Sequence, residues 1–171
     1  AQVFGVGDDP FFVLINGRFE FFERIPGAPA PISATVHRRL HFHEMDPANI
    51  AWHGQYPAFF EAAQQELGKI CGLTYPVLRK AGLIAPIRKF HAEYLLPLNF
   101  DEEFSVTASL LWTDGARVNM EYEIRKNDGR LAGAGYTVQL FMDLNTQQPV
   151  LWDPDFWADF KQRWQAGEFT R

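Results

Sequence analysis

The sequence is poor in the features that mark several large classes of protein. It has one cysteine, Cys71, which permits no internal disulfide and favours a reducing compartment. We expect the cytoplasm, although a periplasmic protein without disulfides would show the same pattern. No apolar run approaches the roughly 20 residues that span a bilayer, and no signal peptide is recognisable. The sequence therefore predicts no membrane span.

The chain also lacks the basic stripe that nucleic-acid and anionic-membrane partners require. Its formal net charge is -5, so neither kind of partner is expected. Its 171 residues are 47% hydrophobic and 22% charged, an ordinary globular composition that suffices for one well-cored domain. Aromatic residues make up 15%. Because a core or a subunit interface must bury these rings, we expect an oligomer.

Residues 1–34 are predicted to be an N-terminal extension. Two apolar runs, Phe11 to Ile15 and Phe19 to Phe22, flank Asn16-Gly17, a dipeptide that favours a two-residue hairpin turn. The proline-rich stretch 26–31 cannot form regular structure and is expected to be a linker on the surface. Since a two-stranded ribbon is marginal alone in water, the hairpin should pack on the main domain or on a partner subunit.

The segment 35–43 alternates as a β-strand. Its polar face carries three histidines and one arginine: His37, Arg39, His41 and His43. Histidines two residues apart on a strand match no standard zinc spacing without a cysteine or a well-placed carboxylate. We therefore expect a solvated or interface strand face and no metal site.

Residues 53–71 show the strongest helical pattern in the chain. Apolar residues recur at three- and four-residue spacing: Tyr56, Phe59, Phe60, Ala63, Leu67, Ile70 and Cys71. Pro57 is tolerated only in a first turn, so the helix is predicted to begin at Gly54 or Gln55. Gly72 supplies the stop. A shorter helix is predicted from Tyr75 to Lys80.

Four strands are predicted beyond these helices, over residues 83–96, 103–112, 117–125 and 131–143. Their short turns indicate an antiparallel meander, and alternation over 117–125 predicts one buried and one wet face. The aromatic segment 152–164 is predicted to be a helix capped by Asp153 or Asp155. Together these elements predict an α+β domain over residues 35–171, with a curved antiparallel sheet wrapped around one long central helix and a C-terminal helical tail.

The junction between the first strand and the long helix carries the candidate chemistry. Asp46 is a lone carboxylate ahead of the helix entrance, and Asn49 lies in the turn between them. A helix start offers unpaired N–H groups and a positive dipole end, so a carboxylate nearby makes a site for attacking a carbonyl and holding the oxyanion. The alternative is a plain turn, in which Asp46 accepts local backbone hydrogen bonds.

Two blocks of residues then point to a family. The first is Asp46-Pro47-Ala48-Asn49-Ile50-Ala51-Trp52-His53 with Tyr56, Phe59-Phe60-Glu61 and Ala63; the second is Arg88-Lys89, Glu93-Tyr94, Pro97 and Asp101, followed by Asp143 and Pro149. From about Val36 to Pro154 the chain resembles the hotdog-fold acyl-CoA thioesterases, in particular the 4-hydroxybenzoyl-CoA thioesterase group and the short-chain acyl-CoA thioesterases associated with the Tol–Pal system. The sequence departs at Asn49, where the family usually has Gly; Asn is the next most tolerant residue of left-handed backbone. The extension 1–34 has no counterpart.

The resemblance implies a hotdog fold that hydrolyses acyl-CoA, with Asp46 as nucleophile or as general base on water. Its second element is the helix entrance, here His53 with Gly54 beside it, whose backbone N–H groups polarise the carbonyl. The chemistry agrees, because a leaving thiolate with a pKa of about 8.5 needs little protonation and one carboxylate can suffice. No cofactor and no metal are implied.

The resemblance also suggests where substrate binds. Arg88 and Lys89 are candidates for the phosphates of coenzyme A, as are Arg38, Arg39, Arg79 and Lys80; the alternative is ordinary solvated charge. The acyl group is expected against aromatic residues that would otherwise be plain core: Trp52, Tyr56, Phe59, Phe60 and Phe90. Family members form homodimers or homotetramers with the site at the interface. Two other functions stay open, namely an acyl-carrier-protein thioesterase and a non-catalytic acyl-binding or scaffolding module.

Overall fold

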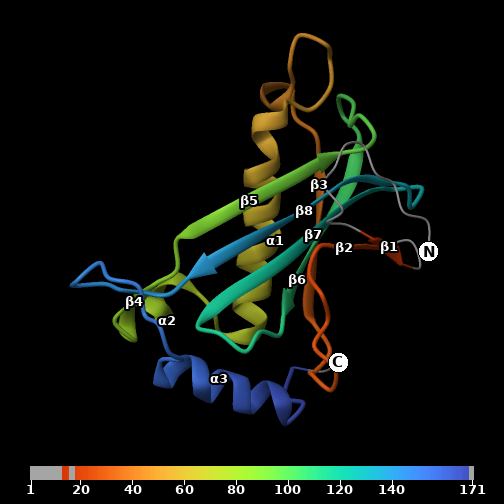
Figure 1. Ribbon diagram of the computed structural model, residues 1–171. Coiled ribbons are helices and arrows are strands. Elements are labelled where there is room, and N and C mark those ends of the chain that lie inside the picture. Colours follow the sequence, from red (N-terminus) through yellow and green to blue (C-terminus); the bar gives the residue numbers. More distant parts are fainter. Residues whose placement is uncertain (1–12, 16–17, 170–171) are drawn as a thin grey trace.

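A five-stranded antiparallel sheet and one long helix form the centre of the computed structural model, which describes residues 13–15 and 18–169 (Figure 1). The sheet has the order β3-β6-β7-β8-β5. Its strands are β3 (Ile32–Arg39), β5 (Ile87–Tyr94), β6 (Glu103–Leu111), β7 (Arg117–Lys126) and β8 (Leu131–Leu140). Helix α1 (Tyr56–Cys71) lies across one face of this sheet. The predicted α+β architecture is confirmed.

Short elements complete the fold. β1 (Val13–Ile15) pairs with β2 (Arg18–Glu20), and β4 (Leu83–Ile84) pairs with β9 (Met142–Asp143). Two 3-10 turns, η1 (Phe42–Glu44) and η2 (His53–Gln55), lie between β3 and α1, while α2 (Tyr75–Lys80) follows α1. Helix α3 (Asp155–Gln165) lies beyond the C-terminal end of α1 (Figure 1).

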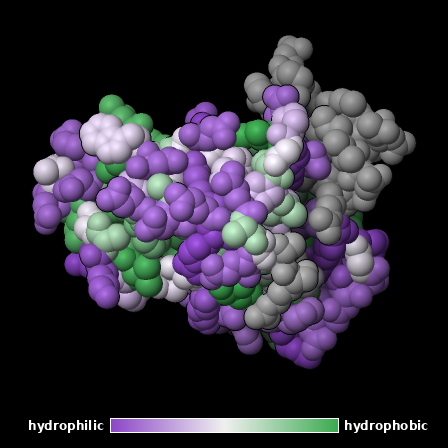
Figure 2. Space-filling view, turned by 90° about the horizontal axis from the view of Figure 1, so that it is seen from below, coloured by the Kyte–Doolittle hydropathy of each residue, from purple (hydrophilic) through white to green (hydrophobic). Residues whose placement is uncertain are grey.

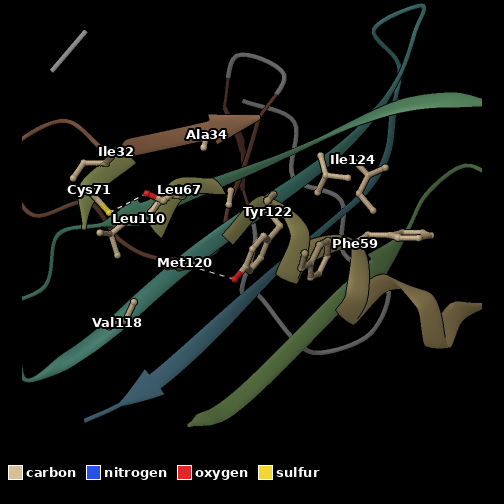
Figure 3. Packing of buried hydrophobic residues seen from close by; sticks show 14 of the residues in the cluster. Ile32, Ala34, Phe59, Leu67, Cys71, Leu110, Val118, Met120, Tyr122 and Ile124 are labelled. Carbon is tan, nitrogen blue, oxygen red and sulfur yellow. Dashed lines mark hydrogen bonds between the residues drawn. The ribbon is translucent and has the colours of Figure 1, made fainter. Parts of the chain in front are cut away.

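The apolar face of α1 is buried as predicted, with one exception. Its side chains meet inward-facing residues of β3, β6 and β7 (Figure 3), and Pro57 lies in the first turn. Gly72 ends the helix in the left-handed conformation, at a φ of 79°. Ile70, however, is 43% exposed. The last turn buries Gly68 and Cys71 instead, so the contact face has turned away from Ile70.

Two predicted long strands are each divided. The strand predicted over 83–96 becomes β4 and β5 because Pro86 lies between them and has no N–H to donate to a ladder. The strand predicted over 131–143 is interrupted at Phe141, where β8 ends and β9 begins. These breaks let β4 and β9 form a separate two-stranded sheet at one end of the molecule.

The predicted meander holds only for β6, β7 and β8. Strand β5 precedes β6 in the chain but pairs with β8 at the far edge of the sheet. Strand β6 has no free edge for it, because β3 and β7 occupy both of its sides. Consequently β5 is an edge strand.

The first strand is displaced relative to its prediction over 35–43. It starts at Ile32 and ends at Arg39, so only His37 and Arg39 of the predicted polar face belong to it. The rings of His41 and His43 stack at 5.7 Å around the η1 turn instead. Among residues 13–15 and 18–169, no group of His, Cys, Asp or Glu is arranged to hold a metal ion.

The N-terminal segment lies on the outer face of the sheet. The predicted hairpin is present as β1 and β2, although Phe11, Phe12 and the Asn16-Gly17 turn fall outside the described residues. Beyond β2, the backbone N–H groups of Phe21 and Phe22 donate to Glu121 Oε1 at 2.7 and 3.1 Å. The Arg24 guanidinium pairs with Glu121 Oε2 at 2.5 Å.

This contact corrects the prediction of a wet polar face on β7. Glu121 is only 6% exposed and its neighbour Asn119 is 4% exposed. A carboxylate can be buried at low cost when charged and N–H donors surround it, and residues 21–24 supply those donors to Glu121.

Helix α3 packs through its aromatic residues. Trp157, Phe160 and Trp164 are buried against the main core, where Phe141 contacts Trp157. The predicted caps are wrong, because the helix is preceded by Pro154 without a side-chain cap and Asp153 instead pairs with Lys161 at 2.8 Å.

Figure 2 views the molecule from below, where polar residues cover most of the visible described surface. Across the described part of the chain, no helix is long and apolar enough to cross a bilayer.

Candidate active site

Asp46 begins a tight loop that leads from β3 to α1. Met45 and Ala51 form an antiparallel bridge, and the Asp46 N–H donates to the Ile50 carbonyl at 2.9 Å. Asn49 closes the loop by donating its N–H to the Asp46 carbonyl at 3.0 Å, with a φ of 60°. The left-handed backbone expected at Asn49 is therefore present.

The carboxylate of Asp46 has one occupied and one open oxygen. Oδ1 accepts the N–H of Ala48 at 2.8 Å, which is the local turn bond that the alternative interpretation predicts. Oδ2 has no donor among the residues that the structure describes, and the side chain is half-buried. The turn bond fixes the carboxylate while leaving Oδ2 available for chemistry.

The entrance of the helix presents open backbone donors. The Gln55 N–H donates to the Trp52 carbonyl at 2.8 Å. Within the described residues, the N–H groups of His53 and Gly54 contact no acceptor. They lie at the positive end of the α1 dipole, where an anion is stabilised.

Aromatic rings surround these donors. The Trp52 ring folds over Gly54, so that a Cβ placed there would lie 2.5 Å from it. The His53 ring lies 5.4 Å from that of Trp52 and 6.5 Å from that of Tyr94, at the end of β5. Residue 54 must therefore be glycine for Trp52 to hold this position.

A buried ion pair that the sequence did not reveal anchors the loop. Glu44 is 3% exposed, and its Oε1 accepts from Arg38 Nη2 at 2.6 Å. Its backbone carbonyl accepts the Trp52 N–H at 2.9 Å. This bond joins the segment before Asp46 to Trp52, the residue before His53. Arg38 lies on β3 and Glu44 in the η1 turn after that strand has ended, so no single periodicity in the sequence relates the two residues.

A cavity of about 290 Å³ lies between α1 and β5. It extends from Pro57 in the first turn of α1 to Gln64, with Phe60 between them and Ile87 and Phe90 on the β5 side. A smaller cavity of about 40 Å³, which shares Gln64 and Gln139, adjoins it beside Met120 and Phe141. The larger volume is close to the lower end of typical small-molecule sites.

The predicted aromatic contacts divide between this cavity and the core. Phe60 and Phe90 line the cavity with their centroids 5.8 Å apart. Phe59 is fully buried under the Arg38 guanidinium, outside the cavity lining. Tyr56 is 3% exposed against Tyr94; burial, with a smaller effect of Tyr94, raises its pKa to about 12. The Tyr56 hydroxyl is therefore protonated at neutral pH.

The candidate phosphate-binding cations fall into two groups, those already in ion pairs and those without one among the described residues. Arg38 is paired with Glu44, and Arg39 pairs with Asp101 and Glu103. Arg88 and Lys89 are exposed on β5, and none of the ion pairs in residues 13–15 and 18–169 involves them. They remain free to meet an anionic ligand.

The sequence of this chain is similar to those of known thioesterases. The model of a family described as the thioesterase-like superfamily matches residues 40–160, which include the Asp46 loop, α1 and the cavity. A putative acyl-CoA thioesterase of Bacillus subtilis, YneP, is 22% identical over 111 residues, covering 65% of this chain and 80% of that protein. The acyl-CoA thioester hydrolase YbgC of Escherichia coli is 20% identical over 124 residues, covering 72% and 92%.

The fold itself is shared with solved structures. The DHNA-CoA thioesterase of Staphylococcus aureus superposes with a TM-score of 0.70 at 24% identity, covering 80% of this chain and 93% of that one. At this identity the similarity establishes the common hotdog fold.

Proposed function

Because the chain belongs to the thioesterase-like superfamily, we propose that it hydrolyses acyl-CoA thioesters to a carboxylic acid and free coenzyme A. The observation that supports this proposal is one closed loop, held by the Trp52 N–H bond to the Glu44 carbonyl, that carries both an open carboxylate oxygen on Asp46 and open N–H groups on His53 and Gly54. A carboxylate and an oxyanion site together suffice for thioester hydrolysis, because the carboxylate attacks or activates water and the oxyanion site stabilises the developing charge.

Asp46 acts on the thioester carbon in one of two ways. As a nucleophile, Oδ2 forms a mixed anhydride and expels the thiolate, and water then hydrolyses the anhydride. As a general base, the carboxylate takes a proton from the attacking water. In both cases the thiolate leaves without strong acid assistance, because its pKa is about 8.5.

The helix entrance stabilises the charge that develops on the carbonyl oxygen. The N–H groups of His53 and Gly54 donate to this oxygen, and the α1 dipole adds a partial positive charge. A single donor of this kind is worth roughly 100-fold to 1,000-fold in rate. The Trp52 ring, which folds over Gly54, shields the Gly54 backbone from water.

The surface around the helix entrance indicates where the other parts of the substrate bind. The acyl group enters the cavity between α1 and β5, whose first lining residue is Pro57, four residues from His53. The phosphates of coenzyme A bind the free cations Arg88 and Lys89. Trp52, which is 46% exposed over Gly54, contacts the thioester region, whereas Tyr56, at 3% exposed, supports that region from the core.

The protein acts as a homodimer or a homotetramer built on dimers. Strand β5 ends the sheet, and its exposed residues include Ile87 and Tyr94, each 53% exposed. An open edge of this length is a template for pairing with a second strand. Antiparallel pairing of two β5 strands around His91 sets the partner's Arg88 opposite Tyr94, and thus near His53. Sedimentation equilibrium tests this arrangement; a mass of one chain under assay conditions would contradict it.

A thiol-release assay tests the proposed activity. Short, long and aromatic acyl-CoAs are compared with the same acyl groups on an acyl carrier protein, and free thiol is measured. We expect release from at least one acyl-CoA and a lower kcat/KM for the carrier thioester, since the exposed cations suit nucleotide phosphates. Preference for the carrier would assign the carrier-protein activity instead, and no release from any thioester would support a non-catalytic acyl-binding module.

A further inference from the structure

The lining of the cavity between α1 and β5 includes a cluster of neutral polar side chains, which we call the polar floor: Gln64, Tyr122, Thr137 and Gln139. The Tyr122 hydroxyl donates to Gln64 Oε1 at 2.9 Å and lies 3.1 Å from the Thr137 hydroxyl. The two carboxamides bond each other, at 3.2 Å from Gln139 Nε2 to Gln64 Oε1 and 3.4 Å in the reverse direction.

These bonds leave the polar floor with unused capacity. Each carboxamide has two N–H donors and uses one, and the carbonyl oxygen of Gln139 accepts one bond where it can accept two. The spare donors and the spare acceptor belong to side chains that line the cavity. A group that both donates and accepts a hydrogen bond would complete the set, and a hydroxyl is the smallest such group.

The walls beside the polar floor are apolar, formed by Phe60, Ile87 and Phe90, while the exposed Glu61 and Gln65 also line the cavity. An acyl group that lies against these walls is therefore expected to be apolar along its length and polar where it meets the floor. An apolar end group would leave the spare donors of the floor buried without partners, which is costly, so the floor and the apolar walls impose different requirements on the acyl group.

The position of the polar floor sets the length of the acyl group. Gln64 is eleven residues beyond His53, or about 18 Å along the axis, because three residues of 3-10 turn rise about 2.0 Å each and eight of α-helix about 1.5 Å each. Helical side chains lean toward the N-terminus, which for a Gln of roughly 5 Å length leaves about 13 Å between the donors and the carboxamide. A hydroxyl that bonds this carboxamide from about 3 Å away lies about 10 Å from the thioester carbon. This is farther than one benzene ring reaches.

The charge around the polar floor selects against ionised groups. None of its four members is charged, and the nearest charged lining residue is Glu61. Burial, with a further contribution from the Glu61 charge, raises the pKa of Tyr122. A terminal carboxylate would lose its hydration, gain no cationic partner in the lining and be repelled by Glu61.

We propose that the preferred acyl groups are apolar chains or ring systems with a neutral hydroxyl about 10 Å from the thioester carbon, bound by Gln64 and Gln139. This assignment rests on the proposed thioesterase activity and adds the substrate class. It makes Gln64 and Gln139 specificity-determining residues that lie apart from the reacting atoms.

Three matched substrates test the assignment: octanoyl-CoA, 8-hydroxyoctanoyl-CoA and octanedioyl-CoA. An extended eight-carbon chain carries its terminal group about 10 Å from the thioester carbon. We expect kcat/KM for the hydroxylated substrate to exceed that for octanoyl-CoA by about 10-fold, as one or two hydrogen bonds to neutral groups provide. Octanedioyl-CoA should be the poorest of the three.

Substitutions of the polar floor provide the second arm of the test. Gln64→Leu and Gln139→Leu should each bring the ratio of hydroxyoctanoyl to octanoyl kcat/KM close to 1. If either variant fails to fold, Thr137→Val makes a smaller change that should still lower the ratio. Gln162→Leu, the same replacement at an exposed position on α3, is the control and should keep the ratio of the unmodified protein.

The outcomes separate the two proposals. Hydrolysis without a preference for the hydroxyl, or an unchanged ratio in both Gln variants, overturns the substrate assignment and leaves the thioesterase activity standing. Absence of hydrolysis with every acyl-CoA, including the short and aromatic ones, overturns both.

Discussion

Replacing Asp46 by Asn is expected to lower kcat/KM for acyl-CoA hydrolysis by about 100-fold or more, which is at least about 2.7 kcal/mol of transition-state stabilisation. An Asn side-chain oxygen still accepts the Ala48 N–H that Asp46 Oδ1 accepts at 2.8 Å, so the loop keeps its shape. The substitution removes only the charge and the nucleophilic oxygen. Its effect should fall on the rate and leave the free energy of unfolding nearly unchanged.

Asp143→Asn is the matched control. Asp143 forms the same kind of turn, with Oδ1 accepting the N–H groups of Asn145 and Thr146 at 2.9 and 2.8 Å. These bonds lower the pKa of the Asp143 carboxyl, yet the residue is the last one of β9, away from the helix entrance (Figure 1). Steady-state kinetics and urea unfolding of both variants separate chemistry from turn stability. Equal losses of activity in the two variants would reduce Asp46 to a turn residue.

Replacing Gly135 by Ala is expected to destabilise the fold by about 3 kcal/mol, at the upper end of what overpacking costs. A Cβ on Gly135 would lie 2.3 Å from the carbonyl oxygen of His91 and 2.7 Å from the Phe60 ring. The first contact is backbone of β5 and cannot rotate away. Either β5 separates from β8 or α1 lifts off the sheet, and both movements distort the cavity.

Gly115→Ala is the control for this substitution. The nearest atom to a Cβ at that position is Thr113 Oγ1 at 3.9 Å, an ordinary contact. Urea unfolding should therefore give Gly115→Ala a stability close to that of the unmodified protein. A Gly135→Ala variant of equal stability would mean that β5 and α1 do not approach β8 as closely as described.

Local sequence patterns predicted the elements that depend on local physics. Gly72 gave the end of α1, and Pro57 gave its start to within two residues, since Gly54 and Gln55 belong to the η2 turn and α1 begins at Tyr56. The left-handed Asn49 followed from the conformational tolerance of that residue. The buried alternation on β7 was also correct for the face toward α1. Each of these features depends on neighbours within a few residues.

The errors concern contacts between distant segments. The pairing of β5 with β8 depends on β3 having taken the free side of β6, which strand patterns do not reveal. Glu121 is buried because Phe21, Phe22 and Arg24 cover it from about 100 positions away. No periodicity within β7 contains that information.

In the candidate site, too, residues close in sequence were predicted and contacts between distant segments were not. Asp46, His53 and Gly54 are close in sequence and were predicted together, and their roles remain a prediction. The polar floor joins α1 to β7 and β8, so the sequence did not reveal it as a unit. One signal was present: Gln64 falls four residues after Phe60 and three before Leu67, on the apolar face of α1, where a carboxamide is unusual.

The structure of a complex with an unreactive acyl-CoA analogue, in which a methylene group separates the carbonyl from sulfur, tests the central claim most directly. We predict the carbonyl oxygen about 3 Å from the backbone nitrogens of His53 and Gly54, with Asp46 Oδ2 facing the carbonyl carbon. A bound analogue whose carbonyl lies away from this helix entrance, or whose carbon Asp46 does not face, would contradict the account.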